Sequence, residues 1–132
     1  MVNNTLVSDY GPNTVFLFAR AGPSTAEVMN NIFSGPGKLT ADEDGGRFWN
    51  FTTNLKVDGN HGFRSIAEYD YRVTSAAGGA IDKGTTPGNL DNVSLLPTGQ
   101  YLHPLKSAPR SILGSSIDTG AYEFGDAPRV IK

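Results

Sequence analysis

The chain has 132 residues, a formal net charge of −2 and no cysteine, and it contains 16 glycines and 8 prolines but only 18% charged residues. This composition is typical of many short strands joined by turns and predicts a single, mainly β domain. It excludes disulfides and cysteine nucleophiles, and the scattered charges argue against nucleic acid as a partner. No apolar run is long enough to span a bilayer and residues 1–5 lack the pattern of a signal peptide, so we expect no membrane partner.

An internal repeat organises residues 1–58. The segment 2–7 (Val-Asn-Asn-Thr-Leu-Val) recurs as 29–34 (Met-Asn-Asn-Ile-Phe-Ser), and a weaker copy covers 53–57. Spacings in the twenties suit the coils of a solenoid in which each coil holds two or three short strands. Such stacking predicts an asparagine ladder in which each side-chain amide bonds to the next coil. Its members would be Asn4, Asn31 and Asn54. The alternative is that the Asn-Asn pairs mark unrelated surface turns.

Strands and loops alternate between these copies. Residues 14–19 form an apolar run bounded by Gly and Pro, which predicts a strand buried on both faces, and residues 26–29 predict a second strand. Residues 40–46 are polar and are expected to be an exposed loop. Trp49 follows between two phenylalanines, and we interpret it as a core or cap residue rather than a sugar platform.

From residue 59 to residue 132 the repeat fades into short strands separated by Gly, Pro and Asn. The last coil of a solenoid exposes an apolar end and unpaired strand edges, which an irregular segment must cover. We therefore expect one domain over 1–132, with repeating coils in 1–58 and a terminal coil with its cap in 59–132.

Three motifs in this second half resemble the closing signature of the pectate-lyase-like superfamily of right-handed parallel β-helix proteins. They are Asp-Tyr-Arg-Val at 70–73, Gly-Ala-Ile-Asp-Lys-Gly at 79–84, and Ile-Asp-Thr-Gly-Ala-Tyr-Glu-Phe at 117–124, with Arg110 before the last. Val73, Gly79 and Thr119 depart mildly from the usual pattern. The resemblance implies an all-β fold, a short right-handed parallel β-helix of about three coils with an irregular C-terminal cap. It also implies a secreted or cell-surface location.

The motifs suit structural roles. Asp82 and Asp118 each stand two residues before a glycine, a pattern typical of turns closed by the aspartate side chain. Tyr122 alternates with its neighbours as in a strand. We expect Arg110 to form an ion pair with Asp82 or Asp118 beneath the cap, in preference to a catalytic role.

Catalytic candidates are few. A polysaccharide lyase needs carboxylates that hold a cation and a basic residue that removes a proton. The available acids are Asp42, Glu43, Asp44 and Asp58, and the available bases are Lys56 and Arg64. Of these, Asp42, Asp44 and Lys56 are the catalytic candidates. The sequence around Asp42 and Asp44 is loosely similar to a calcium loop but lacks its further ligands, so a solvated acidic turn is the preferred interpretation. We expect no cofactor, with calcium at these two aspartates as the alternative.

The first coil would leave apolar residues and backbone groups open at its outer edge, among them Val2, Leu6 and Val15. This predicts a homo-oligomer that forms through the uncapped N-terminal coil. The leading functional hypothesis is a non-catalytic β-helix module, structural or carbohydrate-facing and derived from the C-terminal part of a longer secreted protein. The alternative is a small polysaccharide lyase or glycoside hydrolase whose site is completed by oligomerisation. Polysaccharide is the ligand in the carbohydrate-facing and enzyme hypotheses, whereas a purely structural module needs none.

Overall fold

The protein is all-β, as predicted. The computed structural model describes residues 1–20, 24–43, 47–60 and 62–126, and within these ranges the one helix is the 3₁₀ turn η1 (Ile66–Glu68). No helix in the described part of the chain is long and apolar enough to cross a membrane. The strands are β1 (Thr5–Val7), β2 (Val15–Ala19), β3 (Ser24–Met29), β4 (Ile32–Ser34), β5 (Lys38–Asp42), β6 (Arg47–Thr52), β7 (Leu55–Val57), β8 (Phe63–Ser65), β9 (Asp70–Val73), β10 (Asn89–Leu90), β11 (Val93–Ser94), β12 (Gly99–Leu102) and β13 (Lys106–Pro109).

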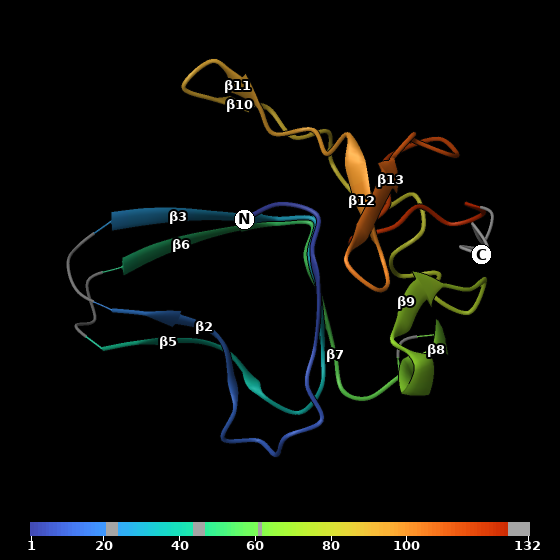
Figure 1. Ribbon diagram of the computed structural model, residues 1–132. Coiled ribbons are helices and arrows are strands. Elements are labelled where there is room, and N and C mark those ends of the chain that lie inside the picture. The colour runs from blue at the N-terminus through green and yellow to red at the C-terminus, as the bar shows by residue number, and fades with distance from the viewer. Residues whose placement is uncertain (21–23, 44–46, 61, 127–132) are drawn as a thin grey trace.

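The first seven strands pair in parallel in three small sheets, β1–β4–β7, β2–β5 and β3–β6. The chain therefore passes through the three sheets twice in the same order and enters the first sheet a third time (Figure 1). We call β1–β3 the first circuit, β4–β6 the second circuit, and β7 the start of the third. Each sheet has two or three strands and none closes on itself.

The central strand β4 is buried on both faces. Ile32 and Phe33 are both 0% exposed although alternate residues of a strand point to opposite sides. The ring of Phe33 packs edge-to-face on Phe16 of β2, with ring centroids 5.6 Å apart. Ile32 packs on the opposite side, in a cluster that includes Phe63 and Val73 from the second half of the chain. The sheet β1–β4–β7 thus separates the interior of the circuits from the second half.

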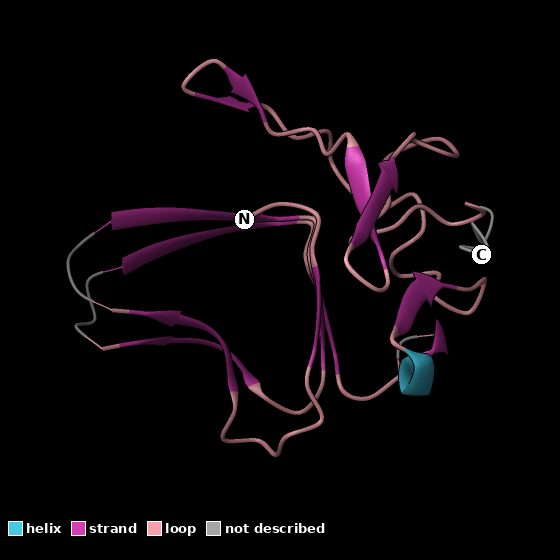
Figure 2. Cartoon of the chain, viewed as in Figure 1, coloured by secondary structure: helices cyan, strands magenta, loops and turns pink. Residues whose placement is uncertain are grey.

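The second half contains three antiparallel pairs, β8–β9, β10–β11 and β12–β13. Figure 2 shows that β8, β9, β12 and β13 lie on the side of the β1–β4–β7 sheet, while β10 and β11 form an arm that projects away. We expected this half to cover the open end of the last coil. It instead packs along the outer face of the sheet, because the apolar side chains that need covering, such as Ile32 and Leu55, point outward there.

One stretch of the second half, the terminal segment (Ile117–Phe124), contacts successive circuits. The side chain of Asn3 in the first circuit donates a hydrogen bond to the carbonyl of Asp118 over 2.9 Å. The backbone N–H of Gly120 donates to the carbonyl of Asn30, one circuit later, over 2.8 Å. The terminal segment therefore links successive circuits by hydrogen bonds.

The close approach of this segment requires glycine at position 120. Gly120 has φ of +101°, and a Cβ there would lie 2.7 Å from Cδ1 of Ile32 and 2.9 Å from Oγ1 of Thr5. Because those atoms belong to buried or half-buried side chains of β4 and β1, a larger residue would have to displace these side chains in addition to adopting a strained positive φ.

Candidate functional site

Asn4, Asn31 and Asn54 lie in register across three circuits. The backbone N–H of Asn4 donates to Oδ1 of Asn31 over 2.9 Å, and the N–H of Asn31 donates to Oδ1 of Asn54 over 2.9 Å. The side-chain amides donate in the same direction. Nδ2 of Asn4 lies 3.1 Å from Oδ1 of Asn31, and Nδ2 of Asn31 lies 2.8 Å from Oδ1 of Asn54. These bonds satisfy polar groups that the packed circuits remove from water.

A second line of side chains was missed by sequence reasoning. Asn3, Asn30 and Thr53 precede the ladder residues, and all three have left-handed backbone with φ of 52°, 55° and 52°. Asn30 uses its whole side-chain amide: its nitrogen donates to Asn3 and to the carbonyl of Thr85, and its oxygen accepts from Thr53 and from the N–H of Thr85. The repeated first asparagine of each pair was the available signal, since asparagine tolerates this conformation.

Arg110 pairs with Glu123 rather than with the aspartates that we expected. Its Nε and Nη2 lie 3.0 Å and 2.6 Å from Oε1 of Glu123, and the two side chains are 2% and 1% exposed. Arg110 also donates to the backbone carbonyls of Gly120 and Asp118. Glu123 belongs to the motif at 117–124, so the sequence shows a glutamate close to Arg110 along the chain. Its inward orientation depends on how that segment bends, which the sequence does not indicate.

Asp118 and Asp82 instead cap turns. Asp118 is fully buried, and its carboxylate accepts from the N–H of Asp82 over 2.6 Å and from the N–H of Phe124 over 2.5 Å. Asp82 accepts from the N–H groups of Ser115 and Ser116 over 2.8 Å and 3.0 Å. Tyr122 is buried, and burial raises the pKa of its hydroxyl. The strand-like alternation expected around Tyr122 is not found, because residues 117–124 contain no strand and the adjacent Glu123 is buried as well. Asp82, Asp118 and Tyr122 thus make contacts that stabilise the packing of the second half.

The catalytic and calcium candidates do not gather. Asp42 ends β5 on the side of the circuits away from β7 (Figure 1), whereas Lys56 lies in β7, where its Nζ contacts Asp58 over 2.7 Å. Asp44 lies outside the described residues. Within the described ranges, no three His, Cys, Asp or Glu side chains are grouped as metal ligands.

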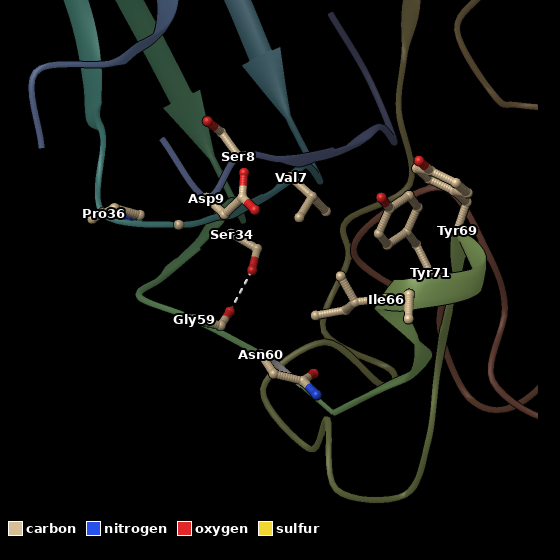
Figure 3. Close-up of a pocket in the computed structure, with 12 residues that line it drawn as sticks. Val7, Ser8, Asp9, Ser34, Pro36, Gly59, Asn60, Ile66, Tyr69 and Tyr71 are labelled. Carbon is tan, nitrogen blue, oxygen red and sulfur yellow. Dashed lines mark hydrogen bonds between the residues drawn. The ribbon is translucent and has the colours of Figure 1, made fainter. Parts of the chain in front are cut away.

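A pocket of about 630 Å³ lies where the circuits meet the second half (Figure 3). One wall is formed by the bends after β1, β4 and β7, which stack through the bonds Ser8 N–H to Ser34 O and Gly35 N–H to Val57 O. Gly35 is required in this stack because a Cβ would lie 1.8 Å from the carbonyl oxygen of Ser8. We call this cavity the large pocket.

The other wall of the large pocket carries two tyrosine rings. Tyr71 belongs to β9 and packs edge-to-face on Phe63 at 5.7 Å, whereas Tyr69 precedes β9 and is 60% exposed. Figure 3 shows both rings beside Val7 and Ile66, with Asp9 and Ser8 across the pocket. Burial, followed by the neighbouring Tyr69 and Asp9, raises the pKa of Tyr71, so its hydroxyl remains a hydrogen-bond donor at neutral pH.

A second cavity of about 290 Å³, the small pocket, lies on the other side of Tyr69, which lines both cavities. Its lining residues are Glu68, Tyr69, Asp70, Arg72, Tyr101, Leu102, His103 and Tyr122. Arg72 binds Asp70 with two hydrogen bonds, 2.7 Å from Nε and 2.5 Å from Nη2, which lowers the pKa of the carboxyl. The ring of Tyr69 stacks on His103 with centroids 5.5 Å apart and an interplanar angle of 25°.

The residues of these pockets were not predicted as a site, because most come from loops whose partners in space are distant in sequence. The motif at 70–73 drew attention to Tyr71 and Arg72 only as parts of a strand. Comparison of the chain with protein-family models, with curated proteins and with solved structures finds no match.

Proposed function

We propose that the chain is a non-catalytic, carbohydrate-facing module that forms the last coils and the lateral cap of a longer right-handed parallel β-helix. The circuits support the fold part of this proposal, since parallel partners recur after 27 and 23 residues and stack like residues on like. The motif resemblance in 70–124 supports the same assignment.

The ladder has a direction that favours further coils before β1. The N–H groups of Asn4 and Asn31 each donate to the asparagine of the following circuit, and Oδ1 of Asn4 accepts no hydrogen bond among the described residues. A preceding coil with asparagine at this bend would supply the donor. Val2 already pairs in parallel with Met29 at the end of β3, as the last residues of such a coil would.

The strand order supports an open edge as well. In the described part of the chain, β1, β2 and β3 are each an outer strand of their sheet. A preceding coil would pair with this edge. In the isolated chain, a second copy that meets the same edge would do so, which keeps the homo-oligomer as part of the proposal.

The large pocket carries the functional part of the proposal. It combines two tyrosine rings with hydroxyl, amide and carboxylate groups from Ser8, Asn60 and Asp9. Sugars present both apolar C–H faces and hydroxyls, and a concave site with aromatic walls and a few convergent polar groups suits such a ligand.

The arrangement favours binding over cleavage. Among the residues that line the large pocket, Asp9 is the single carboxylate, whereas glycoside hydrolysis uses two carboxylates that face each other across the bond. A lyase built from Asp42 and Lys56 is less well supported, because these residues lie on different sides of the circuits.

Binding without turnover is the test. The purified chain is run by affinity electrophoresis through gels that contain neutral or acidic polysaccharides, and the same mixtures are assayed for new reducing ends and for unsaturated uronates. We expect retarded migration with at least one polysaccharide and no product. Asp9→Ala should reduce the retardation, whereas Phe48→Ala, which removes a 71% exposed ring outside both pockets, should not. Turnover would favour the enzyme hypothesis, and unretarded migration in every gel would contradict the carbohydrate-facing role.

A separate measurement tests the open edge. Gel filtration with light scattering on the isolated chain should give a discrete oligomer, because unpaired strand edges associate. A monodisperse monomer at high concentration would contradict the proposed coil-stacking edge and would leave the sugar-binding test unaffected.

A further inference from the structure

Tyr69 separates the two pockets and lines both of them. Its backbone is left-handed, with φ of 56°, a conformation that is strained for an aromatic residue. This conformation follows directly after η1, where the N–H of Tyr69 donates to the carbonyl of Ile66 over 3.1 Å. The strained turn raises the side chain between the two cavities, where it is 60% exposed.

The ring of Tyr69 is supported from the side of the small pocket. It stacks on His103, whose Nδ1 lies 3.3 Å from the hydroxyl of Tyr101. The same hydroxyl accepts from the N–H of Leu105 over 3.3 Å. Tyr101 and His103 come from β12 and the turn after it, so two separate antiparallel pairs hold the ring in place. This degree of support is typical of a preorganised contact residue.

The charges in the two pockets disfavour an anionic ligand. Asp9 lines the large pocket, and none of the described residues that line this pocket is basic. The nearby Lys56 ammonium binds the carbonyl of Gly35 and the carboxylate of Asp58. Glu68 and Asp70 line the small pocket, where the guanidinium of Arg72 is already bound by Asp70 through two hydrogen bonds. A polyuronate would therefore bring carboxylates toward Asp9 and Glu68, neither of which belongs to an ion pair among the described residues, and this is unfavourable.

We propose that the large and small pockets are adjacent subsites for a neutral oligosaccharide of at least two sugar units, whose chain crosses the ring of Tyr69. This inference rests on the proposed carbohydrate-facing function and adds the class of ligand and the path that it takes. The cavity sizes of about 630 and 290 Å³ suit one or more sugar units on each side of the ring. Asp9 and Asn60 provide hydrogen bonds to hydroxyls on one side, and Glu68 and His103 provide them on the other.

The test is a titration of the isotope-labelled chain followed by amide chemical shifts. The probes are cellotetraose, mannotetraose, maltotetraose and xylotetraose, with tetragalacturonate as the acidic counterpart and the matching monosaccharides. We expect one neutral tetrasaccharide to shift amides beside both pockets, such as those of Asn60 and Leu102, and to bind at least tenfold more tightly than its monosaccharide. Tetragalacturonate should bind more weakly than that tetrasaccharide.

Tyr69→Ala should weaken the tetrasaccharide about tenfold, because it removes the aromatic face between the subsites. Tyr69→Gly removes the same ring and suits a left-handed backbone, so it keeps the test valid if the alanine variant folds poorly. Phe48→Ala is the matched control and should bind as the unaltered chain does.

Each outcome separates this inference from the proposed function. If a monosaccharide binds as tightly as its tetrasaccharide, or if only one pocket responds, the chain binds sugar but the two-subsite path is wrong. If tetragalacturonate binds most tightly, the neutral ligand class is wrong. If no sugar shifts any amide, both the inference and the carbohydrate-facing function are refuted.

Discussion

Replacing Arg110 with methionine removes the only basic partner that the structure gives to the Glu123 carboxylate in the described part of the chain. The glutamate side chain is 1% exposed, so the variant leaves a charge in a site that water does not reach. Removal of one partner of a buried ion pair costs about 3–5 kcal/mol. Because single domains are stable by only about 5–15 kcal/mol, Arg110→Met should lose a large fraction of the free energy of unfolding.

Urea unfolding followed by the fluorescence of Trp49, the single tryptophan, measures this loss. Trp49 lies in β6, whereas the terminal segment contains no strand and belongs to no sheet, so a shifted transition at Trp49 reports on more than the altered site. The double variant Arg110→Met with Glu123→Leu should recover most of the loss, because neither charge remains buried.

The matched control is Arg20→Met, which removes an arginine from an exposed pair. Arg20 and Glu43 lie 3.3 Å apart with side chains 80% and 52% exposed, and such pairs contribute about 0–1 kcal/mol. If Arg110→Met lowered the unfolding free energy by no more than this control does, the role assigned to the buried pair would be refuted.

Three further changes test individual positions by the same assay. Thr53→Asn should stabilise the chain by about 1 kcal/mol, because asparagine tolerates the left-handed backbone better than a β-branched residue does, and a loss of stability would contradict this account. Gly120→Ala should destabilise the chain by more than about 2 kcal/mol, since φ is positive and β4 is too close, whereas Gly78→Ala, with nothing within 4 Å of the added Cβ, should be nearly neutral. Asp70→Asn should destabilise the chain at pH 7. Arg72 lowers the pKa of Asp70 in the folded state, so the contribution of the carboxylate is present above its unfolded pKa, near 4, and is lost as pH falls through the folded pKa. A difference between variant and unaltered chain that stays constant down to pH 2 would contradict this linkage.

The spacing of the asparagine pairs is sufficient to predict the register of the circuits. A ladder needs the same short amide at each bend, and the bonds between Asn4, Asn31 and Asn54 connect the positions that the repeat aligns. The strand predicted at 14–19 is observed as β2 (Val15–Ala19), since an apolar run between turn residues has few other stable conformations. The expectation that it is buried on both faces is wrong, because Phe18 is 57% exposed.

The second half was harder to predict because it has no period. Its antiparallel pairs are short, and its contacts with the circuits join residues from 55 positions apart, as between Asn30 and Thr85, to 115 positions apart, as between Asn3 and Asp118. The pockets share this difficulty. Their position depends on a left-handed tyrosine at residue 69, a conformation that residue preferences disfavour. Local sequence therefore indicated the elements of this half but not their placement.

The walls of the large pocket come from both halves of the chain, which couples ligand binding to the docking of the second half. Ser8 and Asp9 follow β1, whereas Ile66 and Tyr69 belong to the segment between β8 and β9. If the second half separated from the β1–β4–β7 sheet, the pocket would cease to exist, so a ligand that binds there must stabilise the docked state.

This coupling predicts that the preferred oligosaccharide raises the free energy of unfolding by about 2.7 kcal/mol at a free concentration of 100 times Kd. Thermal unfolding at increasing sugar concentrations measures the effect, and Phe48→Ala should show the same increase because its ring lies outside both pockets. In Arg110→Met, detachment of the terminal segment from folded circuits would weaken the binding of the oligosaccharide. Part of the binding free energy would then be used to dock the second half again. A sugar that binds the folded chain with a measurable Kd but leaves the free energy of unfolding unchanged would contradict this prediction, because a ligand that binds the folded state alone must stabilise it.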